Sequence, residues 1–243
     1  MDAHPIAAAF ARTRNDRRTA LIPYVMAGYP DLATSEQLAV ALCKAGADII
    51  ELGVPFSDPL ADGVTIQAAA QKSLDQGTTL AATLALARRI SRQVATPIVL
   101  MGYYNPIYSF GVERFCASAA ESGVRGVIVP DLPPEEAEPL WKAANQSGLE
   151  VIFLVSPTST PERIAKVASV AGRTGDGFIY CVSLSGVTGA RDRLPEQLAA
   201  FVTRVRSVTN LPLAVGFGVS RPEHVAEIGT LADGAVVASA LLN

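Results

Sequence analysis

Eight short apolar runs recur along the chain with amphipathic segments between them, and this alternation restricts the fold more than any other feature. We predict strands at residues 21–26, 47–52, 98–101, 126–129, 151–155, 178–182, 213–215 and 235–237. The runs are rich in Val, Ile and Leu and show little apolar–polar alternation, which indicates strands that are covered on both faces and therefore a parallel sheet. Eight such units in about 250 residues predict one (β/α)₈ barrel domain over residues 1–243. A doubly wound open sheet is the alternative.

The segments between the strands carry helix patterns, often with proline or glycine at their ends. We predict helices at residues 6–14, 35–45, 65–75, 80–93, 112–121, 134–146, 161–170, 194–208 and 221–228. Only residues 238–243 follow the last predicted strand, too few for a full covering helix. We therefore expect a barrel that lacks the final covering helix, with the first and last strands less covered on their outer faces.

Composition excludes several classes of protein. The chain is 49% hydrophobic and 18% charged with a net charge of −3, so it can bury a large core and has no basic run for nucleic acid. We expect no membrane segment and no signal peptide. Cys43, Cys116 and Cys181 are widely spaced in apolar surroundings, which favours free thiols and a cytoplasmic location. His4 and His224 are expected at the surface, so neither a histidine-based triad nor a metal site is predicted.

The stretch from Glu51 to Asp62 contains the candidate catalytic groups. Side chains alternate faces along a strand, so Glu51 should share the inner side with Ile49 while Leu52 points outward. A carboxylate inside a barrel is costly unless it is solvated, paired or used. The following loop carries Asp58 and Asp62, and it must fold back if Asp62 is to face Glu51. Two carboxylates over one pocket would serve acid–base chemistry; a strand-end glutamate with a helix-capping aspartate is the structural alternative.

Active sites of such barrels lie at the carboxyl ends of the strands, and the later strands here end in small, glycine-rich loops. Residues 216–220 follow the seventh strand, and Ala238 and Ser239 follow the eighth. Backbone N–H groups in such loops can hold a phosphate, although glycines also occur in ordinary tight turns. Residues 185–191 follow the sixth strand as a candidate lid, or as a surface loop. Tyr24, Leu100, Tyr103 and Phe217 are candidate walls for a flat ring, or plain core residues.

Five motifs together resemble one family. The stretches ELGVPFSDPLADG (51–63), YYNPI (103–107), PDLPPEE (130–136), SGVTGAR (185–191) and GFGVS (216–220) resemble the signatures of the tryptophan synthase alpha subunit, in the same order. The resemblance implies a barrel lyase that cleaves indole-3-glycerol phosphate to indole and glyceraldehyde 3-phosphate in tryptophan biosynthesis. It also implies a β subunit partner in an α₂β₂ heterotetramer. Pyridoxal phosphate would bind to that partner, into which indole passes through a tunnel, and no cofactor is expected in this chain.

The resemblance assigns roles to residues at the matching positions. Glu51 would move the protons, and Asp62 would polarise the indole N–H. The implied substrate contacts are Tyr24, Leu100, Tyr103, Tyr180, Thr188 and Phe217, and the implied phosphate contacts are Gly189, Gly218, Ala238 and Ser239. Asp58 and residues 130–133 match surfaces used toward the β subunit. Two positions depart from the pattern, because Val64 replaces the usual proline and Ala238 replaces the usual glycine.

The residues fit this reaction, but two other functions stay open. One strand-end carboxyl with a raised pKa can protonate indole C3 and then remove the hydroxyl proton of the side chain. The first alternative is another barrel enzyme that acts on a sugar phosphate, because a fold does not fix a function. The second is a regulatory subunit that mainly activates a β partner. Turnover of indole-3-glycerol phosphate, with and without that partner, distinguishes the three.

Overall fold

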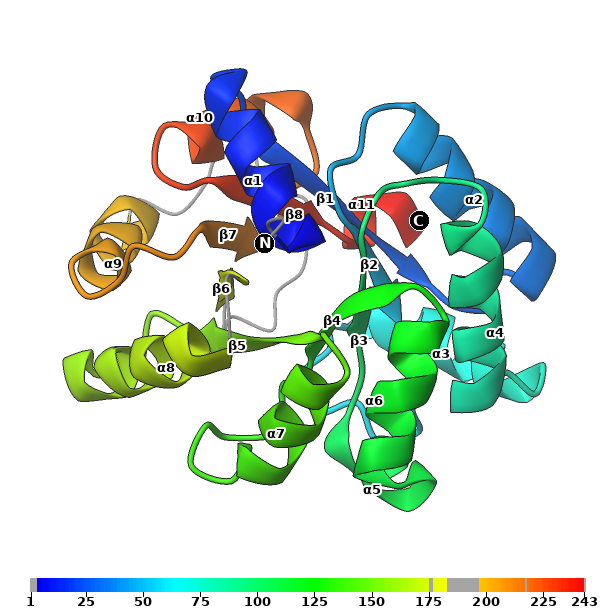
Figure 1. Cartoon of the computed structure of the whole chain (residues 1–243). Helices are drawn as coiled ribbons and strands as arrows, with labels where there is room; N and C mark the ends of the chain where they lie inside the picture. The colour runs from blue at the N-terminus through cyan, green and yellow to red at the C-terminus, as the bar shows by residue number, and fades with distance from the viewer. Residues whose placement is uncertain (1–3, 175–176, 183–196, 217, 243) are drawn as a thin grey trace.

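The eight predicted strands form a closed parallel barrel in chain order. The computed structural model of the chain describes residues 4–174, 177–182, 197–216 and 218–242. Each strand pairs in parallel with the next, and β8 pairs with β1 to close the barrel (Figure 1). The strands are β1 (Ala20–Met26), β2 (Ile50–Gly53), β3 (Ile98–Met101), β4 (Val124–Ile128), β5 (Glu150–Val155), β6 (Ile179–Val182), β7 (Leu213–Gly216) and β8 (Gly234–Val237).

Helices surround the barrel, and the predicted (β/α)₈ architecture is confirmed. The described helices are α1 (Pro5–Asn15), α2 (Leu32–Lys44), α3 (Val64–Asp75), α4 (Leu80–Ser91), α5 (Tyr104–Phe110), α6 (Val112–Glu121), α7 (Glu138–Gln146), α8 (Pro161–Thr174), α9 (Gln197–Arg206), α10 (Pro222–Gly229) and α11 (Ser239–Leu242). Two of them, α5 and α11, were not predicted. Pro106 lies in the first turn of α5, where its missing N–H costs nothing.

Several predicted details need correction. Helix α7 begins at Glu138 rather than at Pro134. His224 is not a surface residue, because α10 turns it toward the barrel and leaves it 3% exposed. The outer side of the β1–β8 seam is also better covered than expected, since Ala235 is buried and Leu21 and Val237 are half-buried. Among the described residues that follow β8, only α11 is helical, and it packs against α3 and β1.

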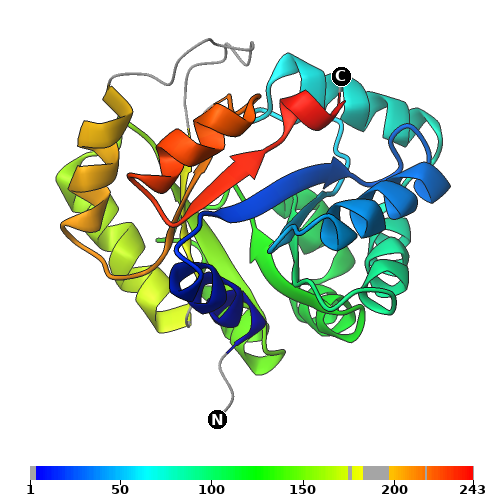
Figure 2. The same cartoon turned by 90° about the horizontal axis from the view of Figure 1, so that it is seen from above.

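Two apolar layers separate the inside of the barrel from its outside. Outward side chains of the strands, such as Leu52, join the helices in one large core cluster. Inward side chains form a second cluster, in which Ile6 and Phe10 of α1 pack with residues such as Ile22 and Phe178. Helix α1 therefore fills the end of the barrel where the strands begin (Figure 2). The opposite end, where the strands finish, is left to form a site.

An ion pair with a buried aspartate joins the end of α1 and the start of β1 to the segment before β2. Asp48 is 2% exposed and accepts hydrogen bonds from Arg18 at 2.6 and 2.7 Å and from the Leu21 N–H at 3.0 Å. Arg12 adds a longer contact of 3.3 Å. Burial alone would raise the pKa of Asp48, but the Arg18 and Leu21 hydrogen bonds outweigh it and lower that pKa. The ionised carboxylate is therefore part of the folded structure.

We expect Asp48→Asn to lower the free energy of unfolding by about 2 kcal/mol near neutral pH, because hydrogen bonds to a charged group are lost. A lowered folded-state pKa contributes stability that is present above the unfolded-state value and is lost as the pH falls through the folded-state value. The difference between wild type and variant should therefore shrink in acid. Urea unfolding at several pH values measures it, with the exposed Asp16→Asn as control. Equal urea midpoints for Asp48→Asn and wild type would contradict the prediction.

Candidate active site

Glu51 lies inside the barrel at the carboxyl end of β2. It is in register with Tyr24 of β1 and Val99 of β3, and it is 2% exposed. Within the described part of the chain its Oε2 atom has no hydrogen-bond partner. Burial, and then the charge of Asp62, raises the pKa of Glu51 from 4.5 to about 8. The carboxyl group is therefore mostly protonated at neutral pH and can donate a proton.

Asp62 is brought over the barrel by a tight turn in the loop after β2. The Asp62 N–H donates to the Pro59 carbonyl at 3.1 Å, and the Ala61 N–H donates to the Tyr103 hydroxyl oxygen at 3.0 Å. Burial raises the pKa of Asp62 from 3.8 to about 6, although a hydrogen bond with Tyr103 opposes the shift. The charge of Asp62 in turn raises the pKa of Glu51. The loop thus folds back over the barrel, and the charge of Asp62 reaches the Glu51 carboxyl group.

Two buried tyrosines flank the carboxyl pair. Burial and the charges of both carboxyl groups raise the pKa of Tyr24 and of Tyr180, so both stay neutral phenols. Each needs a glycine on a neighbouring strand: a Cβ atom on Gly53 would lie 2.0 Å from the Tyr24 oxygen, and one on Gly216 would lie 2.7 Å from the Tyr180 oxygen. These close approaches were missed from the sequence, where Gly53 was only part of a motif and Gly216 part of a glycine-rich loop.

A cavity of about 690 Å³ opens above the carboxyl pair at the carboxyl ends of the strands. Its lining combines apolar and aromatic side chains, such as Tyr24, Met101 and Tyr180, with polar groups. The lining residues used below are Tyr24, Glu51, Leu60, Asp62, Val64, Gln67, Met101, Leu154, Tyr180, Gly216, Gly218, Ser220, Val236, Ala238 and Ser239. The cavity thus combines two ionisable groups with walls that suit a flat apolar ring.

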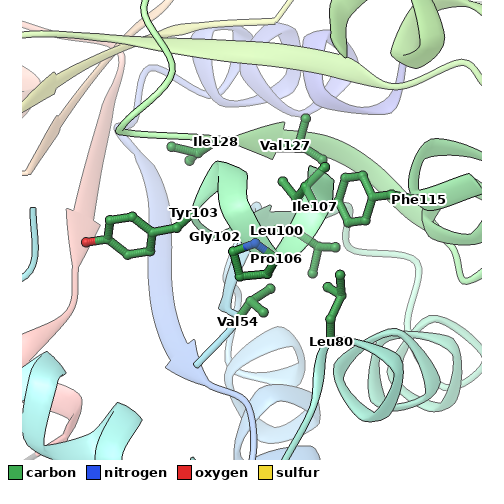
Figure 3. A pocket seen from close by; sticks show the side chains of 10 residues that line it. All are labelled: Val54, Leu80, Leu100, Gly102, Tyr103, Pro106, Ile107, Phe115, Val127 and Ile128. Atoms are coloured by element: carbon green, nitrogen blue, oxygen red, sulfur yellow. The ribbon is translucent and has the colours of Figure 1, made fainter. Parts of the chain in front are cut away.

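Leu100 and Tyr103 are the predicted ring contacts that do not line this cavity. Leu100 is buried in the outer layer and lines a separate small cavity with residues such as Val54 and Phe115 (Figure 3). Its neighbour Met101 lines the large cavity instead, because side chains alternate along β3. Tyr103 also lines the small cavity, but in Figure 3 its ring points away from the other lining side chains, and its hydroxyl group reaches Asp62 and the Ala61 N–H. Tyr103 therefore contacts the loop that carries Asp62 rather than lining the wall of the large cavity.

The predicted phosphate end of the site lies beyond β7 and β8. Gly218, Ala238 and Ser239 all line the large cavity, as does Ser220. Gly218 has a φ of 64°, a left-handed conformation that a side chain would strain. The structure therefore brings these backbone groups to the same cavity as the carboxyl pair. Thr188, Gly189 and Phe217 lie outside the described residues.

The rim beside Asp62 exposes large apolar side chains. Leu60 is 93% exposed and Val64, the first residue of α3, is 70% exposed. Tyr108 on the neighbouring α5 is 68% exposed. Asp58, in the same loop, accepts a hydrogen bond from Ser57 at 2.5 Å. These side chains make this face more apolar than a protein surface that contacts only solvent usually is.

The chemistry of the site can be stated from these groups. No group of three or more His, Cys, Asp or Glu side chains that could hold a metal ion occurs among the described residues. Across the same residues, no helix is long and apolar enough to cross a membrane. A protonated and an ionisable carboxyl group face one apolar cavity at the carboxyl ends of the strands. This fold and site define a (β/α)₈ barrel enzyme whose cavity holds the groups needed for proton transfer.

Comparison with known proteins identifies the family. The family model described as tryptophan synthase alpha chain matches residues 10–243, and the chain belongs to that family. The tryptophan synthase alpha chain of Citrifermentans bemidjiense is 53% identical over 233 residues, 96% of this chain and 86% of that protein. The Roseiflexus castenholzii protein of the same description is 54% identical over 241 residues, 98% of this chain and 90% of that one.

Solved structures agree with this assignment. A structure of Mycobacterium tuberculosis tryptophan synthase has a TM-score of 0.91 at 41% identity and covers 99% of this chain and 91% of that chain. The tryptophan synthase alpha chain of Legionella pneumophila has a TM-score of 0.88 at 36% identity, with 100% and 87% covered. The chain is accordingly a carbon–carbon lyase of tryptophan biosynthesis.

Proposed function

We propose that this chain cleaves indole-3-glycerol phosphate by a retro-aldol reaction in which Glu51 moves the protons and Asp62 stabilises the indole nitrogen. The observation that carries the proposal is the Glu51 carboxyl group. It is buried at a strand end, its pKa is raised to about 8, and the charge of Asp62 acts on it. A general acid transfers a proton to a carbon atom most effectively when its pKa lies near the operating pH.

Glu51 would act twice in one turnover. Its carboxyl proton passes to indole C3, which becomes tetrahedral and leaves a positive charge on the ring nitrogen. The resulting carboxylate then takes the proton of the adjacent side-chain hydroxyl. The carbon–carbon bond breaks, its electron pair returns to the ring as indole, and the hydroxyl carbon becomes the aldehyde of glyceraldehyde 3-phosphate. Protons and electrons balance, and Glu51 ends protonated as it began.

Asp62 would carry the opposing charge. With a pKa of about 6 it is mostly ionised at neutral pH, so it can accept a hydrogen bond from the indole N–H. Positive charge grows on that nitrogen as C3 is protonated, and a fixed carboxylate in a partly buried site stabilises it. Tyr24 and Tyr180, with Met101 of β3, would hold the ring between the two carboxyl groups. Gly53 and Gly216 supply the space that these two tyrosines occupy.

The direct test supplies the substrate to the purified chain. Indole and glyceraldehyde 3-phosphate should appear in equal amounts from indole-3-glycerol phosphate, and faster when a β partner is added. Parallel reactions with ketose and pentose phosphates test the alternative of a sugar-phosphate isomerase or epimerase. Isomerisation of those sugars without any indole release would overturn the proposal. Activation of the partner by a chain without turnover of its own would favour the regulatory alternative.

The phosphate of the substrate is assigned to the N–H groups of Gly218, Ala238 and Ser239, which line the same cavity. We expect Ser239→Asp to raise KM about tenfold or more, because an added carboxylate repels the phosphate. The value of kcat and the melting temperature should change little. Steady-state kinetics measure the effect, and Ser239→Ala, which keeps the backbone N–H, is the control. A KM for Ser239→Asp equal to that of Ser239→Ala would remove this assignment.

A pyridoxal-phosphate-dependent β subunit is the proposed partner, in an α₂β₂ assembly through which indole passes by a tunnel. The exposed apolar side chains of Leu60, Val64 and Tyr108 support an interface on this face, to which Asp58 and residues 130–133 would also contribute. Pyridoxal phosphate would belong to the partner. We also propose a cytoplasmic location, because all three cysteines of the chain are free thiols, as a reducing compartment maintains.

A further inference from the structure

Gln67, in the first turns of α3, is tied to the turn that carries Asp62. Its Nε2 group donates a hydrogen bond to the Asp62 carbonyl at 2.8 Å and a longer one to the Pro59 carbonyl at 3.5 Å. We propose that Gln67 is a positioning residue that fixes Asp62 over the substrate. The inference rests on the catalytic role proposed for Asp62, and it concerns a side chain that reaches the reaction only through another residue.

The position of Gln67 in the helix explains how it acts. Gly63 is the N-cap residue of α3 and provides no side-chain cap. Asp62 is therefore the residue before the cap, and Gln67 is the fourth residue of the helix. Side chains at these two positions commonly pack together and fix the angle at which a chain enters a helix. In this chain the contact between the two positions is polar, because the Gln67 side-chain amide bonds to the Asp62 backbone carbonyl.

The turn has few other contacts that would fix it. Leu60 is 93% exposed and Ala61 is exposed, so neither side chain anchors the turn by burial. On the barrel side the Tyr103 hydroxyl accepts from the Ala61 N–H at 3.0 Å, and the Tyr103 ring lies 5.3 Å from that of Phe56. On the helix side the anchor is Gln67. The two contacts approach the turn from different elements, so together they restrict the direction of the Asp62 side chain.

Helix α3 is a firm base for this anchor. Ala69 and Ala70 on its inner face are buried in one cluster with Tyr24 and Leu242. The helix also contacts β1 and α11, and α11 begins with Ser239 of the phosphate end. Gln67 thus connects the turn that carries Asp62 to elements that hold the rest of the site. A small displacement of a catalytic group lowers the rate more than it lowers binding.

The test compares matched substitutions on the same helix. Gln67→Met keeps a similar length and helix propensity but removes the N–H donor. Gln71→Met is the control, because Gln71 lies one turn later and donates to Asp75 at 2.8 Å, away from the turn. We expect Gln67→Met to lower kcat about tenfold with KM within about twofold of wild type. Gln71→Met should leave both within about twofold, and both variants should keep the wild-type melting temperature within a few degrees.

A pH profile distinguishes positioning from a general loss of structure. Burial, together with the charge of Asp62, raises the pKa of Glu51, Tyr24, Tyr103 and Tyr180, and the hydrogen bond with Tyr103 lowers the pKa of Asp62 itself. If Gln67→Met lets the turn move from Tyr103, that hydrogen bond is lost. The acid limb of kcat should then move to higher pH. Gln67→Lys, which retains N–H donors, should restore kcat to within about threefold of wild type.

Asp62→Asn, measured in the same series, separates failure of this inference from failure of the proposed function. If Asp62→Asn keeps wild-type kcat, the catalytic role of Asp62 falls, and the positioning role falls with it. If Asp62→Asn is slow but Gln67→Met keeps wild-type kcat and an unmoved acid limb, only the positioning role is overturned. The positioning role is also overturned if Gln67→Lys is as slow as Gln67→Met, or if Gln71→Met is equally slow.

Discussion

Replacement of Glu51 by glutamine is expected to lower kcat for indole release by about 10³-fold, within the range of 10²–10⁴ that general acid–base groups contribute. The carboxyl group is mostly neutral at neutral pH, because its pKa is raised to about 8. Glutamine is therefore close to it in both shape and charge, but it has no proton to give. KM should stay within about threefold of wild type, since binding is preserved when only proton transfer is lost. Stopped-time assays of indole formation measure the loss.

The same substitution has a second readout that does not depend on activity. A carboxyl group with a raised folded-state pKa contributes stability that is fully present below its unfolded-state value near 4.5 and is lost as the pH rises through about 8. Wild type should therefore lose stability relative to Glu51→Gln between these two values. Glu51→Asp, which is one methylene shorter, tests whether the carboxyl group must extend as far into the site as it does in wild type. Near-normal turnover by Glu51→Gln, or parallel pH–stability curves, would exclude the acid role of Glu51.

Replacement of Asp62 by asparagine is expected to lower kcat by about 10²-fold, because the fixed negative charge opposite the indole nitrogen is lost. The pKa of Asp62 is about 6, so wild-type kcat should rise as the pH increases through this value and ionises the group. It should fall again as the pH passes about 8, where Glu51 loses the proton it must donate. The two limbs belong to an interacting pair rather than to isolated residues. Asp62→Asn should lose the acid limb.

Asp58→Asn is the matched control for this experiment. Asp58 lies in the same loop, but its side chain is exposed and bonds to Ser57. The Asp58→Asn variant should keep both limbs of the pH profile and most of the wild-type kcat in the isolated chain. A profile for Asp62→Asn with the same acid limb as wild type would show that another group titrates near 6. A kcat within twofold of wild type would remove Asp62 from the chemistry.

The barrel and the carboxyl pair could be predicted because local patterns determine them. Eight apolar runs fixed the strand order, and β3 was predicted with the bounds that the structure has. Alternation along β2 predicts that Glu51 points inward, and in the structure its side chain is buried. The same alternation, if applied across the β2–β3 register from Glu51 to Val99, would have selected Met101 rather than Leu100 for the cavity wall.

The rest depends on distances between residues that are far apart in the chain. Gly53 is needed because the Tyr24 hydroxyl would collide with a Cβ atom there, and no pattern in the sequence predicts that approach. Tyr103, the N-cap residue of α5, holds the Asp62 turn from the segment after β3, and His224 is buried by the way α10 packs on the barrel. Gln67 has an ordinary helix composition around it, so its contact with the turn emerges only from the folded loop.

Among the described residues, helix α1 closes the barrel at the end where the strands begin and leaves the end where they finish open. Ile6 and Phe10 fill the base, and the Phe10 and Phe178 rings lie 5.5 Å apart there. Substrate and both products must therefore use the same end of the barrel, and an indole still inside delays the next substrate. A partner bound to the exposed rim around Leu60 and Val64 would cover this open end of the barrel. Such a partner would determine which product leaves toward solvent and which passes into the partner.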